Sequence, residues 1–386
     1  MDMESGVRFA KTDEELKTSY RLRYTVYIEG MSRLKDKADH VLKELRDEAD
    51  RYARCIIAVK NNKVIGTLRV FWGKDCAFST SLIDAYGLSS FLNNIKQDKI
   101  CIAERLVVDE NSRGSSTTLL IYKELMNFVI ENQIEAVFLD CETHHLNSYL
   151  KLGFRPFSST YSYPGIGLVI PMVLITGDYQ HLKRVGSPFA FLTREQDLAY
   201  CRHTEILQSI ILGKNRIVSV GSTSYEKFLD KIHSFMEKIT EKKKGFLVDF
   251  SDDELEKILR KSHIVECEKG AQITVKGNPS QSIYLLLSGM IEIRHHNELQ
   301  AIITANEIIG EVSYFLDLPW MINMYAASNI KILVLNRTQI SLVLKNDMGL
   351  ANKLLLKFCQ QLSQKIIDNS DLVSLRDYEQ NNGKDK

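Results

Sequence analysis

The stretch Tyr149-Leu150-Lys151-Leu152-Gly153-Phe154 ends the segment that decides the fold of the first half of the chain. Before it come an apolar strand pattern at 100–108, a polar turn at 109–116 that opens a helix, and a second strand pattern at 136–140. Gly153 can adopt the left-handed conformation that often ends a helix. The free N–H groups at the start of the helix after the turn would face an anion. The order strand, turn, helix, strand, helix therefore predicts an α/β unit with an anion-binding turn.

Size and composition limit the class of protein. The 386 residues are 44% hydrophobic and 26% charged, which fits a globular protein of more than one domain. The formal net charge of +1 favours neither a nucleic-acid partner nor an anionic membrane. The longest apolar run, 167–175, is far shorter than the ~20 residues of a membrane helix, and the first residues lack the basic and apolar parts of a signal peptide. We therefore predict no membrane span.

Cysteine and histidine spacing indicates the compartment and argues against a metal. The seven cysteines include no C-x-x-C pair, which favours a reducing, cytoplasmic location. His144 and His145 lie near Cys141 and Glu142, but this spacing matches no familiar zinc pattern. We predict neither a metal nor a tightly bound cofactor.

Changes in composition divide the chain into four predicted parts. Residues 1–200 alternate strand and helix patterns, 201–245 are helical and charged, and 246–372 carry short β runs with regular glycines before an amphipathic helix. Residues 373–386 are polar and are predicted to form a flexible tail. The predicted fold class is α+β: a mixed sheet with flanking helices, a helical linker, and a small β-roll with a terminal helix.

The order of elements from 100 to 154 resembles the GNAT superfamily of acyltransferases, whose pantetheine-pyrophosphate donors bind at the turn before the helix. In that family the turn usually reads R/Q-x-x-G-x-G/A, and here it reads Arg113-Gly114-Ser115-Ser116-Thr117-Thr118. Arg113 matches, whereas Ser116 and Thr118 replace the two small residues, which alters the cradle for the pyrophosphate. The resemblance implies that the donor is bound by Arg113, Gly114, Ser115, Ser116 and Thr117. An ordinary helix start without a ligand is the alternative.

Three further motifs resemble a narrower branch, the acyl-homoserine-lactone synthases and the long-chain N-acyl amino acid synthases. They are, in order, Leu22-Arg23-Tyr24-x-Val26-Tyr27, Asp47-x-x-Asp50 and Val64-Ile65-Gly66-Thr67-x-Arg69. In those families the equivalent charged residues form a cluster near the donor and acceptor sites. The resemblance therefore implies a cluster of Arg23, Asp47, Asp50, Arg69 and Arg105, for which surface salt bridges are the alternative.

Two residues are candidates for catalysis. Arg105 fits an E-x-x-R pattern of this branch, but the expected acid falls on Ile102, and Glu104 lies adjacent instead. Neighbours on a strand face opposite sides, so Glu104 and Arg105 can reach one cleft only across a β-bulge. Glu104 is a candidate general base for the acceptor amine or, alternatively, a structural partner of a basic side chain. Tyr149 matches the tyrosine that protonates the leaving thiolate in many GNAT enzymes, or is a core aromatic residue.

The β-rich part resembles the cyclic nucleotide-binding domain family, through the run 283–293 and Gly310-Glu311-Val312-Ser313-Tyr314-Phe315. In that family the glutamate binds the ribose, and an arginine after a proline neutralises the cyclic phosphate. Here Trp320 follows Pro319. We predict a nucleotide-like pocket of Gly310, Glu311 and Trp320 that binds cAMP and cGMP weakly or not at all. If the rest of this pocket is intact, Trp320→Arg is expected to improve the binding.

Together these resemblances imply an N-acyltransferase. It would move a long acyl chain from acyl carrier protein or CoA, as a co-substrate, to the amine of a small molecule. The C-terminal domain would regulate the enzyme or mediate a homodimer through its last helix. A protein lysine acetyltransferase gated by a cyclic nucleotide is one alternative. A non-catalytic sensor or scaffold is another, because both ligand motifs depart from their family patterns.

Overall fold

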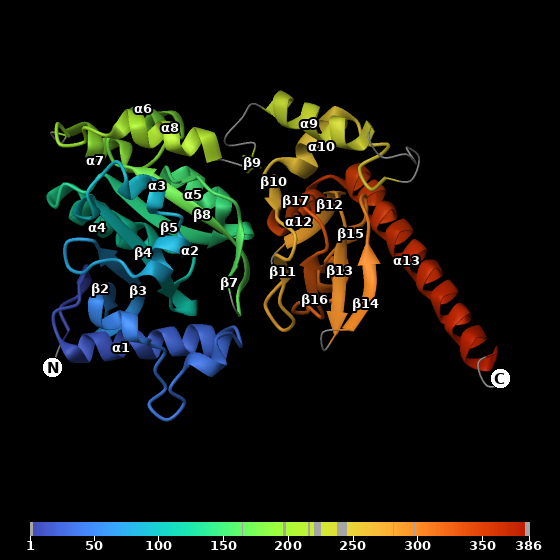
Figure 1. Ribbon diagram of the computed structural model, residues 1–386, viewed down its shortest axis with the longest axis horizontal. Coiled ribbons are helices and arrows are strands. Elements are labelled where there is room, and N and C mark those ends of the chain that lie inside the picture. The colour runs from blue at the N-terminus through green and yellow to red at the C-terminus, as the bar shows by residue number, and fades with distance from the viewer. Residues whose placement is uncertain are drawn as a thin grey trace.

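The computed structural model describes residues 3–163, 165–195, 198–214, 217–219, 225–237, 245–280, 282–295 and 298–382. Figure 1 shows an N-terminal α/β domain beside a C-terminal β-roll, with one long helix, α13, on the outer side of the second domain. This arrangement confirms the predicted fold class.

The first domain is built on one mixed sheet with the strand order β1-β2-β3-β4-β5-β8-β6, and β7 pairs with β8. Only β4 and β5 pair in parallel, while the other neighbours are antiparallel. The strands are β1 (Gly6–Phe9), β2 (Arg54–Lys60), β3 (Lys63–Trp72), β4 (Ile100–Val108), β5 (Ala136–Glu142), β6 (Arg155–Pro156), β7 (Tyr161–Tyr163) and β8 (Gly167–Ile175).

Helices cover both faces of this sheet. They are α1 (Asp13–Tyr24), α2 (Thr80–Ala85), α3 (Ser89–Leu92), α4 (Thr117–Glu131), α5 (Leu146–Leu152), α6 (Tyr179–Arg184), α7 (Ala190–Glu195) and α8 (Thr204–Lys214). The apolar side of α4 packs on one face, and α3 and α8 pack on the other. A side chain at Gly66 would lie 2.9 Å from Ile121 Cδ1, so this glycine lets the start of α4 approach β3. Gly153 ends α5 with φ of 105°, as its sequence position predicted.

The second domain consists of two antiparallel sheets with the orders β15-β12-β17-β10-β9 and β11-β16-β13-β14. Its strands are β9 (Val218–Ser219), β10 (His263–Cys267), β11 (Gln272–Thr274), β12 (Ser282–Ser288), β13 (Ile291–His295), β14 (Glu298–Ile303), β15 (Ile308–Ile309), β16 (Asn323–Ala326) and β17 (Ile330–Asn336). Its helices are α9 (Tyr225–Glu237), α10 (Asp252–Leu259), α11 (Glu311–Phe315), α12 (Arg337–Asn346) and α13 (Met348–Asn382).

The region 201–245, predicted as a linker, contributes to both cores. Leu207 and Ile211 of α8 pack in the first domain, whereas Phe228 and Ile232 of α9 pack in the second. At the other end, α13 stays helical to Asn382, past the position at which a flexible tail is predicted to begin. Among the helices of the described residues, none is long and apolar enough to cross a membrane.

Candidate functional site

A β-bulge on β4 brings two adjacent charged side chains to one site. Thr67 pairs with Val107 and Arg69 pairs with Glu104, so β4 has one residue more than β3 over this interval. Arg105, within the interval, has φ of 52°, a left-handed conformation that is uncommon outside glycine. Because neighbours on a regular strand face opposite sides of the sheet, this bulge is what allows Glu104 and Arg105 to reach the same cleft.

Six charged side chains form one network beside this bulge, which we call the charged cluster: Arg23, Arg69, Arg105, Asp47, Asp50 and Glu104. Arg69 is its centre, and its two Nη atoms donate to Asp47 (2.7 Å) and Glu104 (2.5 Å). Asp50 lies 3.3 Å from Arg69 and accepts from Arg23 at 2.6 Å, while Arg105 donates to Asp47 at 2.6 Å. The structure thus brings together all five residues of the predicted cluster and adds Glu104.

The centre of the charged cluster is buried, unlike a set of surface salt bridges. Arg23 is 0% exposed and Arg69 is 4% exposed. Burial works against the charge of Asp50, but the charges of Arg23 and Arg69 outweigh it and hold the pKa of Asp50 below its ordinary value. Burial also disfavours the charged form of Arg69, but Glu104, Asp50 and Asp47 together raise the pKa of Arg69. Each charge in this network therefore depends on the others for its stability.

The sheet opens next to the charged cluster, between β4 and β5. These strands pair only where Ile100–Ile102 lies beside Ala136–Phe138, although both strands continue in the same direction. Glu104 and Asp140 each lie two residues past the last pair, on the face shared by Ile102 and Phe138. Two carboxylates therefore stand on opposite sides of this opening.

Tyrosines hold both carboxylates in place. Tyr86 donates to Glu104 Oε1 at 3.0 Å, and Tyr161 donates to Asp140 Oδ2 at 2.5 Å. Burial raises the pKa of Asp140 to about 6, although the hydrogen bond from Tyr161 acts in the other direction. Sequence patterns do not single out Asp140, Tyr86 or Tyr161. The one available signal is a polar residue near the end of the apolar strand β5.

The predicted donor residues share one exposed turn at the start of α4. Gly114 has φ of 75°, and a Cβ there would meet nothing within 4 Å. The Ser115 hydroxyl donates to Ser112 O and accepts from the backbone N–H of Thr117. Ser116 makes no side-chain cap of α4. Arg113 is exposed.

Tyr149 lies on the same face of the sheet as α4, beside Tyr122 and Phe154. Tyr122 donates to the Tyr149 hydroxyl at 3.1 Å, and the two rings are perpendicular, with centroids 5.9 Å apart. Burial raises the pKa of Tyr149 well above its ordinary value. Tyr149 therefore holds its proton at neutral pH, and its hydroxyl has a fixed orientation.

In the second domain, two of the three predicted pocket residues are in contact. Trp320 is buried, stacks on Tyr284 with ring centroids 5.4 Å apart, and lies against Gly310, where a Cβ would be 2.8 Å from the indole. Glu311, also buried, pairs with Lys365 of α13 at 2.6 Å. Trp320 is a core residue and does not face an open anion site. The structure therefore does not show the open pocket on which the expected effect of Trp320→Arg depended.

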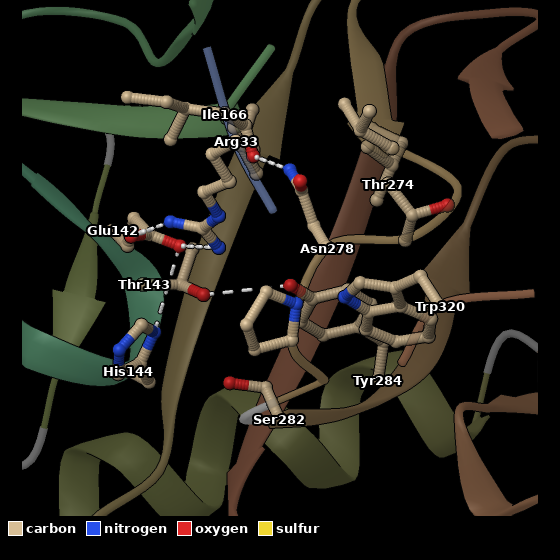
Figure 2. A pocket seen from close by; sticks show the side chains of 14 residues that line it. Arg33, Glu142, Thr143, His144, Ile166, Thr274, Asn278, Ser282, Tyr284 and Trp320 are labelled. Atoms are coloured by element: carbon tan, nitrogen blue, oxygen red, sulfur yellow. Dashed lines mark hydrogen bonds and ion pairs between the residues drawn. The ribbon is translucent and has the colours of Figure 1, made fainter. Parts of the chain in front are cut away.

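Trp320 and Tyr284 also line a small cavity between the two domains (Figure 2). On the other side of the cavity, Arg33 donates two hydrogen bonds to Glu142, at 2.7 and 3.0 Å. The hydroxyl of the next residue, Thr143, lies 3.5 Å from the Tyr284 hydroxyl. The cavity measures about 20 Å³, enough for a water molecule and too small for a nucleotide. In the part of the chain that the structure describes, no cluster of histidine, cysteine and acidic residues could hold a metal ion.

Comparisons with known proteins assign both domains. The family model of the N-acyl amino acid synthase FeeM matches residues 18–178, and that of the cyclic nucleotide-binding domain matches residues 264–347. No curated protein matches the chain significantly.

Several solved structures are similar to parts of the chain. A CoA-dependent acyl-homoserine lactone synthase, BjaI, is 16% identical over 48% of this chain and 91% of its own, with a TM-score of 0.39. A cyclic nucleotide-binding domain from Methylobacillus flagellatus KT is 23% identical over 39% and 84%, with a TM-score of 0.33. The sensor domain of the regulator DNR from Pseudomonas aeruginosa is 20% identical over 36% and 94%, with a TM-score of 0.30.

The stretch that matches the synthase family contains the charged cluster, the opening between β4 and β5, and the turn before α4. The chain therefore carries an N-acyl amino acid synthase FeeM domain at residues 18–178 and a cyclic nucleotide-binding domain at residues 264–347.

Proposed function

We propose that this protein transfers a long-chain acyl group from a thioester of CoA or acyl carrier protein to the amine of a small molecule. The observation that carries the proposal is the position of the charged cluster, which lies at the rim of the opening between β4 and β5. An opening in a sheet gives an extended thioester access to the strand edges. The carboxylates beside it are suited to hold an ammonium group.

The donor would bind with its phosphates at the turn before α4. The N-terminal end of this 15-residue helix favours negative charge, and the guanidinium of Arg113 can bind a phosphate through two hydrogen bonds. Ser115 and Thr117 add hydroxyl groups to the same turn. We assign Tyr149 as the group that gives a proton to the leaving thiolate, with Tyr122 fixing its orientation.

The direct test is product analysis with the full-length protein. Dodecanoyl-CoA and dodecanoyl-acyl carrier protein would each be incubated with a mixture of the proteinogenic amino acids, and N-acyl products detected by mass spectrometry alongside release of free thiol. We expect an N-acyl amine and an equal amount of thiol. Binding of the acyl-CoA without any amide product would instead favour the non-catalytic sensor.

Arg113→Ala is expected to weaken donor binding by about tenfold to a hundredfold, because a charge-assisted hydrogen bond contributes roughly 1.5–3 kcal/mol. Isothermal titration with dodecanoyl-CoA measures this change. Lys123→Ala is the matched control, since it removes an equal charge from the exposed side of α4, further from the turn. Equal affinities of Arg113→Ala and the wild-type protein would exclude this turn as the donor site.

We propose that the second domain has a regulatory role. We also propose that it binds cAMP and cGMP more weakly than millimolar. The phosphate-binding arginine of the family is replaced by the buried Trp320, and Glu311 is already neutralised by Lys365. A nucleotide-gated lysine acetyltransferase requires tight binding, so titration of the full-length protein with cAMP separates the two functions. Micromolar affinity would support the gated enzyme.

The last helix is a candidate dimer contact. On α13, Leu356, Ile366 and Ile367 are 58%, 66% and 54% exposed. If this face pairs with a second copy, Ile367→Glu is expected to halve the mass measured by light scattering. Leu212→Glu, which changes an exposed leucine of α8 in the first domain, should leave the mass unchanged. A monomeric wild-type protein at micromolar concentration would rule out this contact.

A further inference from the structure

The two carboxylates at the opening between β4 and β5 have different surroundings. Both oxygens of Glu104 accept hydrogen bonds, Oε2 from Arg69 (2.5 Å) and Oε1 from Tyr86 (3.0 Å). Within the described part of the chain, Asp140 receives a side-chain hydrogen bond only from Tyr161, and no basic side chain forms an ion pair with it. Titratable pairs in unlike surroundings commonly divide the roles in proton transfer.

We propose that Asp140 is the general base that deprotonates the acceptor amine, and that Glu104 positions the amine as a member of the charged cluster. This inference rests on the proposed N-acyl transfer and reassigns the role that the sequence indicates for Glu104. Asp140 lies across the opening from Glu104, so an ammonium group held between the two strands would be within reach of both carboxylates.

The groups around Asp140 favour this role. Burial raises its pKa to about 6, so at neutral pH the carboxylate is largely ionised and is a stronger base than an ordinary aspartate. Its acidic neighbours are Glu104 of β4, which is paired with Arg69, and Glu142 of β5 itself, which is paired with Arg33. The tyrosines that interact with Asp140 are Tyr161 and Tyr163 of β7, Tyr86 after α2, and, from the α4 side of the sheet, Tyr122 and Tyr149.

The proposed step balances without another reactant. The acceptor ammonium gives one proton to Asp140, and the free amine attacks the thioester carbonyl carbon, forming a C–N bond. The tetrahedral intermediate then breaks its C–S bond. Tyr149 gives a proton to the thiolate, and the second proton lost by the nitrogen restores Tyr149. Asp140 releases its proton to water, so each turnover gives one amide, one thiol and one proton.

The test is the pH dependence of kcat/KM for the full-length protein. Dodecanoyl-CoA would be the donor and the best amino acid of the product analysis the acceptor, from about pH 5 to about pH 9. We expect the wild-type kcat/KM to fall as the pH drops below about 6, where Asp140 becomes protonated. Asp140→Asn is expected to lower kcat/KM at pH 7 by about 100-fold or more and to abolish this acid limb.

Two further variants separate a base from a structural residue. Tyr161→Phe removes a hydrogen bond that favours the ionised Asp140, so the acid limb is expected to move to higher pH. Glu104→Gln should raise KM for the acceptor and retain the acid limb. The Tyr161→Phe shift remains informative if Asp140→Asn fails to fold, which urea unfolding followed by circular dichroism would reveal.

Two results would overturn the inference while leaving N-acyl transfer in place. One is an unchanged acid limb in both Asp140→Asn and Tyr161→Phe. The other is loss of the limb in Glu104→Gln, which would return the role of base to Glu104. Absence of turnover by the wild-type protein with every amino acid and both donors is a different outcome, because it overturns the proposed function and this inference with it.

Discussion

Replacing Arg69 by methionine is expected to lower the free energy of unfolding by about 3–5 kcal/mol, because removing one partner of a buried ion pair leaves uncompensated charges. Arg69 contacts three carboxylates, of Asp47, Asp50 and Glu104, at 2.5–3.3 Å. Methionine has a similar length but donates no hydrogen bond. The same change should raise KM for the acceptor, since Glu104 loses the guanidinium that holds it.

Urea unfolding followed by circular dichroism measures the effect. Arg51→Met is the matched control, because Arg51 pairs with Glu48 at the surface (3.5 Å, side chains 58% and 92% exposed) and such pairs contribute about 1 kcal/mol or less. Arg69→Lys keeps the charge but lacks the planar guanidinium, so its loss of unfolding free energy should be intermediate. Equal midpoints for Arg69→Met and Arg51→Met would show that the network does not stabilise the fold.

The acid dependence of stability gives a second measurement on the same variant. The pKa of Asp50 is lowered in the folded protein, so its stabilising contribution is present above the unfolded pKa of about 3.9 and is lost as the pH falls through the folded value. Arg69→Met removes one of the two charges that lower this pKa. The variant should therefore lose less stability than the wild-type protein between neutral pH and strongly acidic pH.

Trp320→Arg is expected to lower the free energy of unfolding of the second domain by about 3–5 kcal/mol or more, which is the cost of truncating a buried tryptophan. The change should not create cAMP binding. The indole stacks on Tyr284 and contacts Gly310, and both contacts would be replaced by an unpaired buried charge. Because Trp320 also lines the cavity between the domains, the loss should loosen the contact with Thr143 of the first domain.

The neighbouring Met321→Arg is the control, since Met321 is 50% exposed and can direct a charge into water. Thermal unfolding followed by circular dichroism, with cAMP titration of each variant, compares the two. A stable Trp320→Arg protein with micromolar cAMP affinity would mean that the indole occupies a working phosphate site.

Local patterns account for most of the first domain. Strand 100–108, the turn before α4, the glycine end of α5 and the charged motifs each depend on residues close together in the chain. The charged cluster was predictable as a set because its motifs occur in family order. The burial of its side chains and its hydrogen bonds could not be predicted, because they depend on how α1, β3 and β4 pack.

Other features of the site depend on packing between elements that are distant in sequence. The bulge at Arg105 is defined by the register of β4 with β3. The opening between β4 and β5 exists because these strands do not pair beyond Ile102 and Phe138. The pKa of Asp140 depends on burial and on Tyr161, 21 residues away.

Trp320 is a second case in which a motif does not reveal how the side chain packs. Its position in the motif indicates a missing arginine, but only the packing of Tyr284 and Gly310 shows that the side chain is part of the core. The order of the elements can be predicted from local periodicity, and the motifs indicate which side chains are available to the site. Burial, register and partners come from contacts across the fold, and these give Glu104 and Asp140 their different surroundings.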